Sequence, residues 1–215
     1  RHEFVEDERA AYADRAYERH GTTVLAPSTA ARLLEALAPE PGDSVLVVGA
    51  GIGYTTAVVA EIAGASTVQA IDISRRLVVE ARSNLAAAGY GEVFVDRRNG
   101  SEGLPEYAPY DCILLEAAAI EPPRTLVKQL ADDGRLVMPL GASAQSLVTV
   151  NAEGRVTERF GPIAFHPMLV EGEQSGTVER NRTLREDREH AERTAERRRG
   201  WEHEWLDWDE RLDSR

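Results

Sequence analysis

The sequence has little cysteine, little lysine and no long hydrophobic run, and each shortage excludes a class of protein. Cys112 is the one cysteine in 215 residues and lies in an apolar run, which excludes a disulfide framework and a cysteine metal site. The five histidines are scattered, so we expect no metal. No segment approaches the roughly 20 apolar residues of a membrane-spanning helix, and the acidic N-terminus lacks a signal-peptide pattern. We therefore expect a soluble, cytoplasmic protein without membrane contact.

The charge of the chain is strongly one-sided. The formal net charge is −12, and every basic residue except Lys128 is arginine. An acidic, lysine-poor surface disfavours binding to nucleic acid or anionic lipid, because both need a positively charged footprint. A large charge of one sign is tolerated where salt screens it, so a halophilic source is a hypothesis that this composition favours.

The most informative stretch surrounds residues 44–54. Four apolar, mostly β-branched residues, Val45–Val48, precede three glycines at alternate positions from 49 to 53. This pattern predicts a buried parallel strand that ends in a tight turn, followed by a helix over residues 55–62. Glycine lets a ligand approach the backbone closely, and the free N–H groups at a helix start favour a nucleotide. Tyr54 stands where the dinucleotide fingerprint places its third glycine, so the spacing favours S-adenosylmethionine over NAD.

A second predicted strand supports a nucleotide site. It covers residues 68–71 and ends at Asp72, about 20 residues after the glycines, where a carboxylate can accept hydrogen bonds from both ribose hydroxyls. The alternative is an ordinary aspartate at the end of a strand. The glycine turn and the acid are more specific together than either feature is alone.

Strands and helices alternate along the rest of the chain. We expect a helix with an irregular approach over residues 1–19 and a loop over 20–27. Further predicted helices cover residues 28–38, 75–88 and 122–130, with Ser28 and Ser74 as N-caps of the first two, and further strands cover 93–95, 111–115 and 134–139. Residues 146–150 and 155–160 form a final hairpin. The alternation indicates an α/β fold with a doubly wound, mostly parallel sheet of Rossmann-like type and an antiparallel C-terminal hairpin.

In such sheets, ligands bind beyond the carboxyl ends of the strands. The candidate cofactor residues that gather at these ends are Gly49, Ala50, Gly51, Gly53, Tyr54, Asp72, Ile73, Asn99, Gly100 and Glu116. Each one alone is unremarkable as a loop residue. Their convergence predicts a cofactor site.

The composition changes after Gly176, where charged residues dominate and a solvated helix is expected. Trp201, Trp205 and Trp208 fall on one face of that helix. This face either packs on its own domain or serves a protein partner or self-association. We divide the chain into N-terminal helices and a substrate loop (1–43), an S-adenosylmethionine-binding α/β domain (44–172) and a charged helical extension (173–215).

Several motifs between residues 1 and 170 occur in a recognisable combination. They are Arg1-His2-Glu3-Phe4-Val5, Tyr12-Ala13-Asp14, residues 21–27, residues 45–54, Asn99-Gly100-Ser101, Tyr110-Asp111, Ala117-Ala118-Ala119, residues 134–141 and Phe165-His166-Pro167. Together they resemble the protein-L-isoaspartate O-methyltransferases, which are class I S-adenosylmethionine-dependent methyltransferases. The resemblance implies methyl transfer to the α-carboxylate of isoaspartate, with isoaspartyl-containing proteins or peptides as partners. It also implies that the substrate meets Thr22, Val24, Ala26 and Pro27, and that Thr23 and Leu25 lie at the transfer centre.

The sequence departs from this family at four positions. Leu25 replaces a serine at the transfer centre, Val47 an acid in the glycine strand, Asn99 an aspartate, and Glu116 a hydroxyl-bearing residue. As a hypothesis, Glu116 partly replaces the lost acid near the methionine ammonium group. Two alternatives to isoaspartyl methylation stay open: a relative that methylates another acceptor, and a non-catalytic member that uses the fold for interaction.

Overall fold

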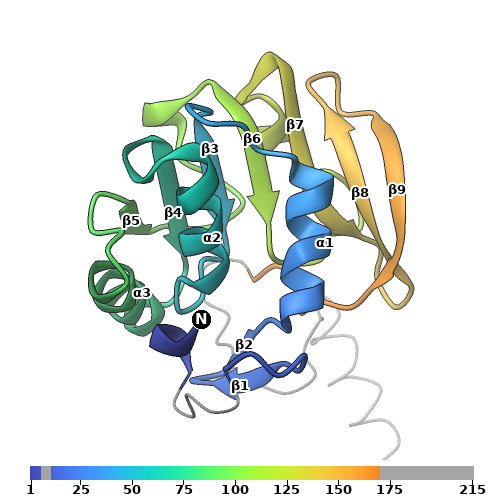
Figure 1. Cartoon of the computed structure of the whole chain (residues 1–215). Coiled ribbons are helices and arrows are strands. Elements are labelled where there is room, and N and C mark those ends of the chain that lie inside the picture. The colour runs from blue at the N-terminus through green and yellow to red at the C-terminus, as the bar shows by residue number, and fades with distance from the viewer. Residues whose placement is uncertain (6–10, 170–215) are drawn as a thin grey trace, which may run out of the picture. The chain divides into compact units, whose positions relative to one another are not determined.

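The computed structural model describes residues 1–5 and 11–169, and its centre is a seven-stranded sheet (Figure 1). The strand order is β5-β4-β3-β6-β7-β8-β9. The strands are β3 (Val45–Val48), β4 (Val68–Asp72), β5 (Phe94–Arg97), β6 (Tyr110–Leu115), β7 (Leu130–Leu140), β8 (Gln145–Asn151) and β9 (Val156–Ile163). The first five in the spatial order pair in parallel, whereas β8 and β9 are antiparallel to their neighbours. The predicted mostly parallel sheet with a C-terminal hairpin is confirmed.

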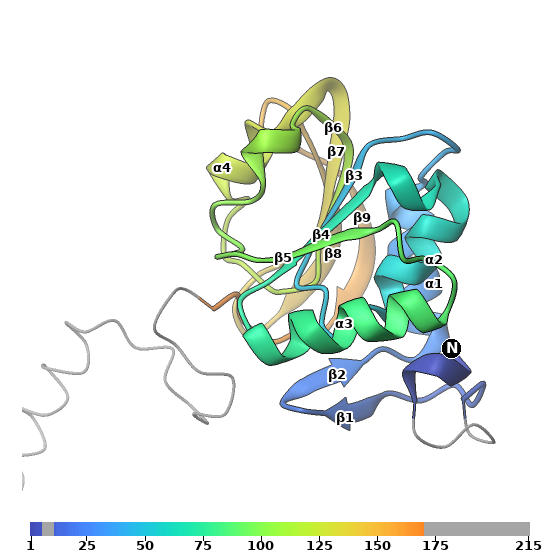
Figure 2. The same ribbon diagram turned by 90° about the vertical axis from the view of Figure 1, so that its left-hand side faces the viewer.

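Helices cover both faces of the sheet. Figure 2 shows α1 (Pro27–Leu37), α2 (Tyr54–Ala63) and α3 (Arg75–Ala87) on one side and α4 (Arg124–Val127) on the other. Val45 and Val47 belong to the apolar cluster under the three long helices, while Leu46 and Val48 belong to the cluster on the opposite face. Because both faces are covered, β3 has no polar position, and this explains its unbroken apolar sequence.

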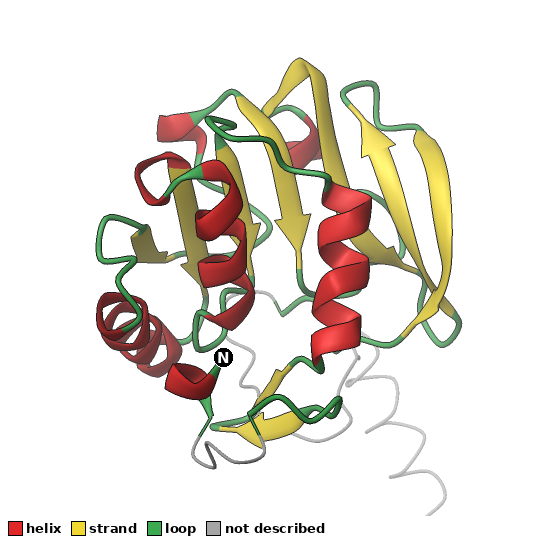
Figure 3. Ribbon diagram, in the orientation of Figure 1, coloured by secondary structure: helices red, strands yellow, loops and turns green. Residues whose placement is uncertain are grey.

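The N-terminal region differs from the expected helix and loop. Residues 2–4 form a short 3-10 helix, and β1 (Tyr17–Arg19) pairs with β2 (Thr22–Val24) in an antiparallel hairpin. His20 and Gly21 have φ of +52° and +79°, as a two-residue hairpin turn requires. Figure 3 shows this hairpin beside the edge at which β4 and β6 end.

Two further local predictions are wrong at their edges. The helix expected to start at Ser28 begins at Pro27, because proline suits the first helical position and the Ser28 N–H donates to Asp14 Oδ1 at 2.9 Å. The helix expected over residues 122–130 is confined to α4, because Leu130 already pairs with Tyr110 as the first residue of β7. By contrast, Ser74 caps α3 as predicted and accepts a hydrogen bond from the Leu77 N–H.

In the described ranges, no helix is long and apolar enough to cross a membrane. The predicted charged helix and its face of Trp201, Trp205 and Trp208 lie outside the described residues. Their role stays a prediction.

Candidate functional site

The glycine turn follows β3 and leads directly into α2. Its first two N–H groups, from Gly49 and Ala50, donate to the Ile71 carbonyl at 2.9 and 3.0 Å and bind the turn to β4. Gly53 has φ of +93°, and a Cβ there would lie 3.2 Å from Leu85 of α3. Glycine at this place therefore permits both the turn and the close packing of α3 against it.

Asp72 stands at the carboxyl end of β4 and holds the turn from the other side. Its Oδ2 accepts the Gly51 N–H at 2.9 Å, and its Oδ1 accepts the Ser74 N–H at 2.8 Å. Burial raises the pKa of the Asp72 carboxyl, and these two N–H bonds partly oppose the rise. A carboxylate has about four acceptor positions, so it can still accept hydroxyl groups of a ligand.

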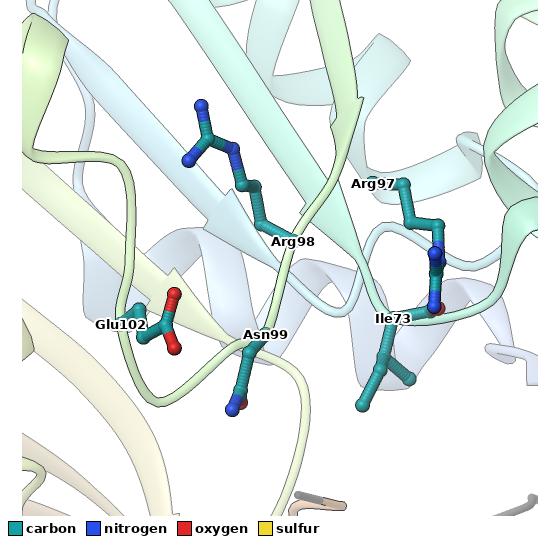
Figure 4. A pocket seen from close by; sticks show the side chains of 5 residues that line it. All are labelled: Ile73, Arg97, Arg98, Asn99 and Glu102. Carbon is teal, nitrogen blue, oxygen red and sulfur yellow. The ribbon is translucent and has the colours of Figure 1, made fainter. Parts of the chain in front are cut away.

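A shallow hollow opens beside the ends of β4 and β5 (Figure 4). Its volume is about 170 Å³, and its lining residues are Ile73, Arg97, Arg98, Asn99 and Glu102. Asn99 Oδ1 accepts bonds from the N–H and hydroxyl of Ser101, which leaves its amide NH₂ as the donor for a ligand. Arg98 extends away from Asn99 in Figure 4 and is paired with Asp96 and Glu106, whereas Arg97 Nε donates to the Ile73 carbonyl at 3.1 Å. The hollow is thus lined mainly by polar and charged side chains, with the Asn99 amide as a free donor.

Glu116 follows β6 and lies against the glycine turn. Its N–H donates to the Val48 carbonyl at 2.8 Å, and its Cβ lies 3.5 Å from the place that a Cβ on Gly49 would take. Oε1 is buried and has no hydrogen-bond partner in the part of the chain that the structure describes. Burial raises the pKa of Glu116 to about 8, a bond from the Thr55 side chain lowers it, and the charge of Asp72 adds to the rise.

The hairpin brings the predicted substrate segment to the same place. Thr22 Oγ1 lies 3.4 Å from the position of a Cβ on Gly51. Thr23 points to the other side of β2, where its hydroxyl donates to Glu18 at 2.9 Å. Val24 and Leu25 are buried, and Leu25 packs in the cluster with Phe4. The half-buried Ala26 and Pro27 lead into α1.

Arg1 holds the backbone of the substrate segment in place and was not among the site residues predicted from the sequence. Its guanidinium donates to the carbonyls of Leu25 and Arg15, each at 2.9 Å. It also lies over the rings of Tyr17 and Tyr54, 5.4 and 5.3 Å from their centroids. No spacing rule points to such a role, because its partners are carbonyl groups far along the chain. Likewise, no motif predicts that Arg97, Arg98 and Glu102 line the hollow; their position at and after the end of β5 was the available signal.

The terminal described segment pairs with Ala118, two residues after Glu116. The Ala118 N–H donates to the His166 carbonyl, and the Met168 N–H donates to the Ala118 carbonyl, at 2.8 and 2.9 Å. Met168 also lies 3.9 Å from the position of a Cβ on Gly100. Residues 166–168 therefore return to the edge where the candidate residues gather.

Fold and site together define a class I S-adenosylmethionine-dependent methyltransferase: a parallel sheet, a glycine turn at its centre and an acid after the next strand. The family model of protein-L-isoaspartate(D-aspartate) O-methyltransferase matches residues 1–172, and the chain belongs to that family. This confirms the predicted enzyme class and S-adenosylmethionine as its cofactor.

Similar proteins agree with this assignment. The chain is 42% identical to a protein-L-isoaspartate O-methyltransferase of Aeropyrum pernix over 183 residues, which are 80% of this chain and 69% of that one. A solved protein-L-isoaspartate O-methyltransferase has a TM-score of 0.70 at 25% identity, covering 78% of this chain and 57% of the other. A beta-aspartate methyltransferase from Plasmodium falciparum, solved with S-adenosyl-L-homocysteine, has the same fold, with a TM-score of 0.68 at 23% identity and coverages of 78% and 84%.

Proposed function

We propose that this chain transfers the methyl group of S-adenosylmethionine to the α-carboxylate of isoaspartyl residues in damaged proteins and peptides. The observation that carries the proposal is the position of Thr22 against the glycine turn. It brings the segment that family resemblance assigns to the substrate next to the segment that spacing assigns to the cofactor. Donor and acceptor of a methyl group must meet in this way.

The residues present fit the cofactor. The glycine turn provides a cradle that a side chain would fill, Asp72 provides a carboxylate for ribose hydroxyls, and the hollow at Asn99 suits the base. Glu116 provides a buried acid without a partner among the described residues. When bound, S-adenosylmethionine supplies a methyl group on a positively charged sulfonium.

The acceptor determines what the chain itself must do. A carboxylate is ionised near neutral pH, so the chain needs no strong general base. Its task is to align the carboxylate oxygen and to exclude water. The buried Val24 and Leu25 supply an apolar wall, and Arg1 fixes its backbone through the Leu25 carbonyl.

Methyl incorporation from labelled S-adenosylmethionine tests this function. We expect an isoaspartyl peptide to be labelled and the aspartyl peptide of the same sequence to remain unlabelled. The label should be released by mild alkali, because a carboxyl methyl ester is hydrolysed there. Equal labelling of both peptides, or no labelling of either, would contradict the proposal.

A second candidate is methylation of another acceptor, and the burial of Leu25 favours it. The Leu25 side chain is 8% exposed and offers no hydrogen bond where the family has a serine. Alkali-stable label on an added protein mixture would indicate this second candidate, because methylated nitrogen and sulfur resist hydrolysis.

The cellular setting belongs to the same proposal. The net charge of −12 supports a cytoplasm of high salt concentration. Turnover that rises between low and molar salt would support this setting, and turnover that falls steadily would contradict it.

A further inference from the structure

The two acids beside the glycine turn differ in how their oxygens are satisfied. Asp72 accepts a backbone N–H on each oxygen, at 2.8 and 2.9 Å. Glu116 has a buried Oε1 with no partner among residues 1–5 and 11–169. A buried acceptor without a donor is costly, and a buried charge without a partner is more costly still. One oxygen of Glu116 therefore has no donor among the described residues, whereas both oxygens of Asp72 have one.

The register of the sheet shows where Glu116 points. Val47 pairs with Leu114 and Val48 pairs with Leu115, so Glu116 lies opposite the first glycine of the turn. Side chains alternate along a strand, and Glu116 therefore shares the face of Leu114, which is the face under α2. Thr55, in the first turn of α2, bonds to the Glu116 side chain from that face.

Among the described residues, no positively charged side chain acts on the pKa of Glu116. From β4, Asp72 is negative. From α2, the Thr55 hydroxyl is neutral, and burial raises the pKa of Tyr54, so that its phenol is neutral near pH 7 as well. From the end of β3 comes Gly49, and from the segment after β6 come Ala117 and Ala118, none of which titrates.

We propose that Glu116 receives the α-ammonium group of the methionine end of S-adenosylmethionine and loses its proton when that ligand binds. The inference rests on the proposed function and assigns one of its binding residues. A neutral acid avoids the cost of an isolated buried charge in the free protein. The incoming ammonium group then stabilises the carboxylate form as a partner. Binding of the ammonium group and compensation of the Glu116 charge therefore occur together.

Ligand binding and protonation of Glu116 should oppose each other. The pKa of Glu116 is about 8 in the free protein. An opposite charge within contact distance lowers a carboxyl pKa by about 1–3 units, so binding at pH 7 releases about 0.4–0.9 proton per ligand. Because the complex holds fewer protons, affinity rises with pH, by about three- to twentyfold between pH 6 and pH 7.5.

Calorimetric titration of the full chain with S-adenosylhomocysteine, which keeps the ammonium group, measures both quantities. Binding enthalpies in two buffers of different ionisation enthalpy give the number of protons released. 5′-Methylthioadenosine, which keeps the nucleoside and lacks the ammonium group, is the matched ligand. Glu116→Gln removes the titrating group with little change of shape. Glu158→Gln, at an exposed position of β9, is the matched control.

We expect the parent and Glu158→Gln to release the proton with S-adenosylhomocysteine and not with 5′-methylthioadenosine. Glu116→Gln should release none and bind at least threefold more weakly at pH 7.5. Glu116→Thr should likewise release no proton and bind more weakly. If thermal melting shows Glu116→Gln to be unfolded, Glu116→Thr takes its place in the experiment. The number of protons that the parent releases on binding is measured without any variant, so this part of the test does not depend on how the variants fold.

Three results would overturn the inference. Parent binding without proton release, with an equally tight Glu116→Gln, would refute the role of Glu116 and leave the proposed function intact. Proton release with 5′-methylthioadenosine would place the titrating group away from the ammonium site. Absence of any binding to the parent would reject the proposed function together with this inference.

Discussion

Asp72→Ala is the substitution whose consequences the structure defines most sharply. The change removes a carboxylate that is 8% exposed and that accepts two backbone N–H groups. Loss of one charge-assisted hydrogen bond to a ribose hydroxyl costs about 1.5–3 kcal/mol. We therefore expect affinity for S-adenosylhomocysteine to fall roughly tenfold to 150-fold.

The same substitution also affects the free protein. Gly51 is buried, so its N–H loses its acceptor without access to water, whereas the half-buried Ser74 can turn to solvent. One unsatisfied buried donor costs about 1–3 kcal/mol, and the free energy of unfolding should fall by that amount. The loss of affinity must therefore be measured at a temperature where the variant remains folded.

Calorimetry combined with thermal melting separates the two effects. Asp43→Ala is the matched control: its Oδ2 accepts the Glu40 N–H at 2.8 Å, and it lies before β3, at the opposite end of the sheet from the glycine turn. It should lose stability without losing affinity. If folded Asp72→Ala binds S-adenosylhomocysteine as tightly as the parent does, Asp72 does not hold the ribose and the reasoning is refuted.

Three other predictions concern the hairpin and the tail. Leu25→Ser and Leu25→Ala should both lower the free energy of unfolding by about 2–5 kcal/mol in denaturant titrations, because Leu25 is buried. If a hydroxyl at position 25 acts in methyl transfer, Leu25→Ser should methylate an isoaspartyl peptide on the order of 100-fold faster than Leu25→Ala. Equal turnover of the two variants would show that no hydroxyl is needed at this position. Glu80→Gln should speed hydrogen exchange in β1 and β2 about tenfold and leave α2 unchanged, because Glu80 pairs with Arg19 and His20 of the hairpin. Removing the residues after Gly176 should leave ligand affinity nearly unchanged, since the family match ends at residue 172; a large loss in calorimetry would count against this.

The sheet could be predicted because its signals are local. The strand β3 is buried on both faces and is an unbroken apolar run, and β6 is buried and apolar from Cys112 onward, after the exposed Asp111. The start of α3 was predictable from Ser74, whose side chain accepts a bond three residues further along. In each case the residues that determine the element lie within it or next to it.

The hairpin could not be predicted in the same way. Three-residue strands are too short to show a period of two, and the contacts that fix the hairpin are distant in sequence. Arg1 reaches the Leu25 carbonyl, and Arg19 reaches Glu80 of α3. For a similar reason α4 is shorter than expected, since pairing of Leu130 with Tyr110 competes with its last turn.

For the candidate site, sequence reasoning specifies position better than contact. The rule that parallel strands end at one edge brings the glycine turn, Asp72 and Glu116 together, and the structure places them in contact. The same rule does not reveal that both Asp72 oxygens accept backbone N–H groups while Glu116 Oε1 has no partner among the described residues. This difference depends on which N–H groups lie within reach of each carboxylate, which no spacing encodes.

That difference bears on the choice between two nucleotide ligands. A dinucleotide would bring its pyrophosphate to the glycine turn, where it would oppose ionisation of Glu116, on which no described basic side chain acts. Asp72 does not discriminate, because it can accept ribose hydroxyls from either ligand. S-adenosylmethionine brings two cationic groups, the sulfonium and the ammonium, and no phosphate. Glu116 therefore disfavours the first ligand and favours the second, whose ammonium group can pair with its carboxylate. Charge therefore supports the same ligand as the displaced third glycine, and the two arguments are independent because one rests on spacing and the other on burial.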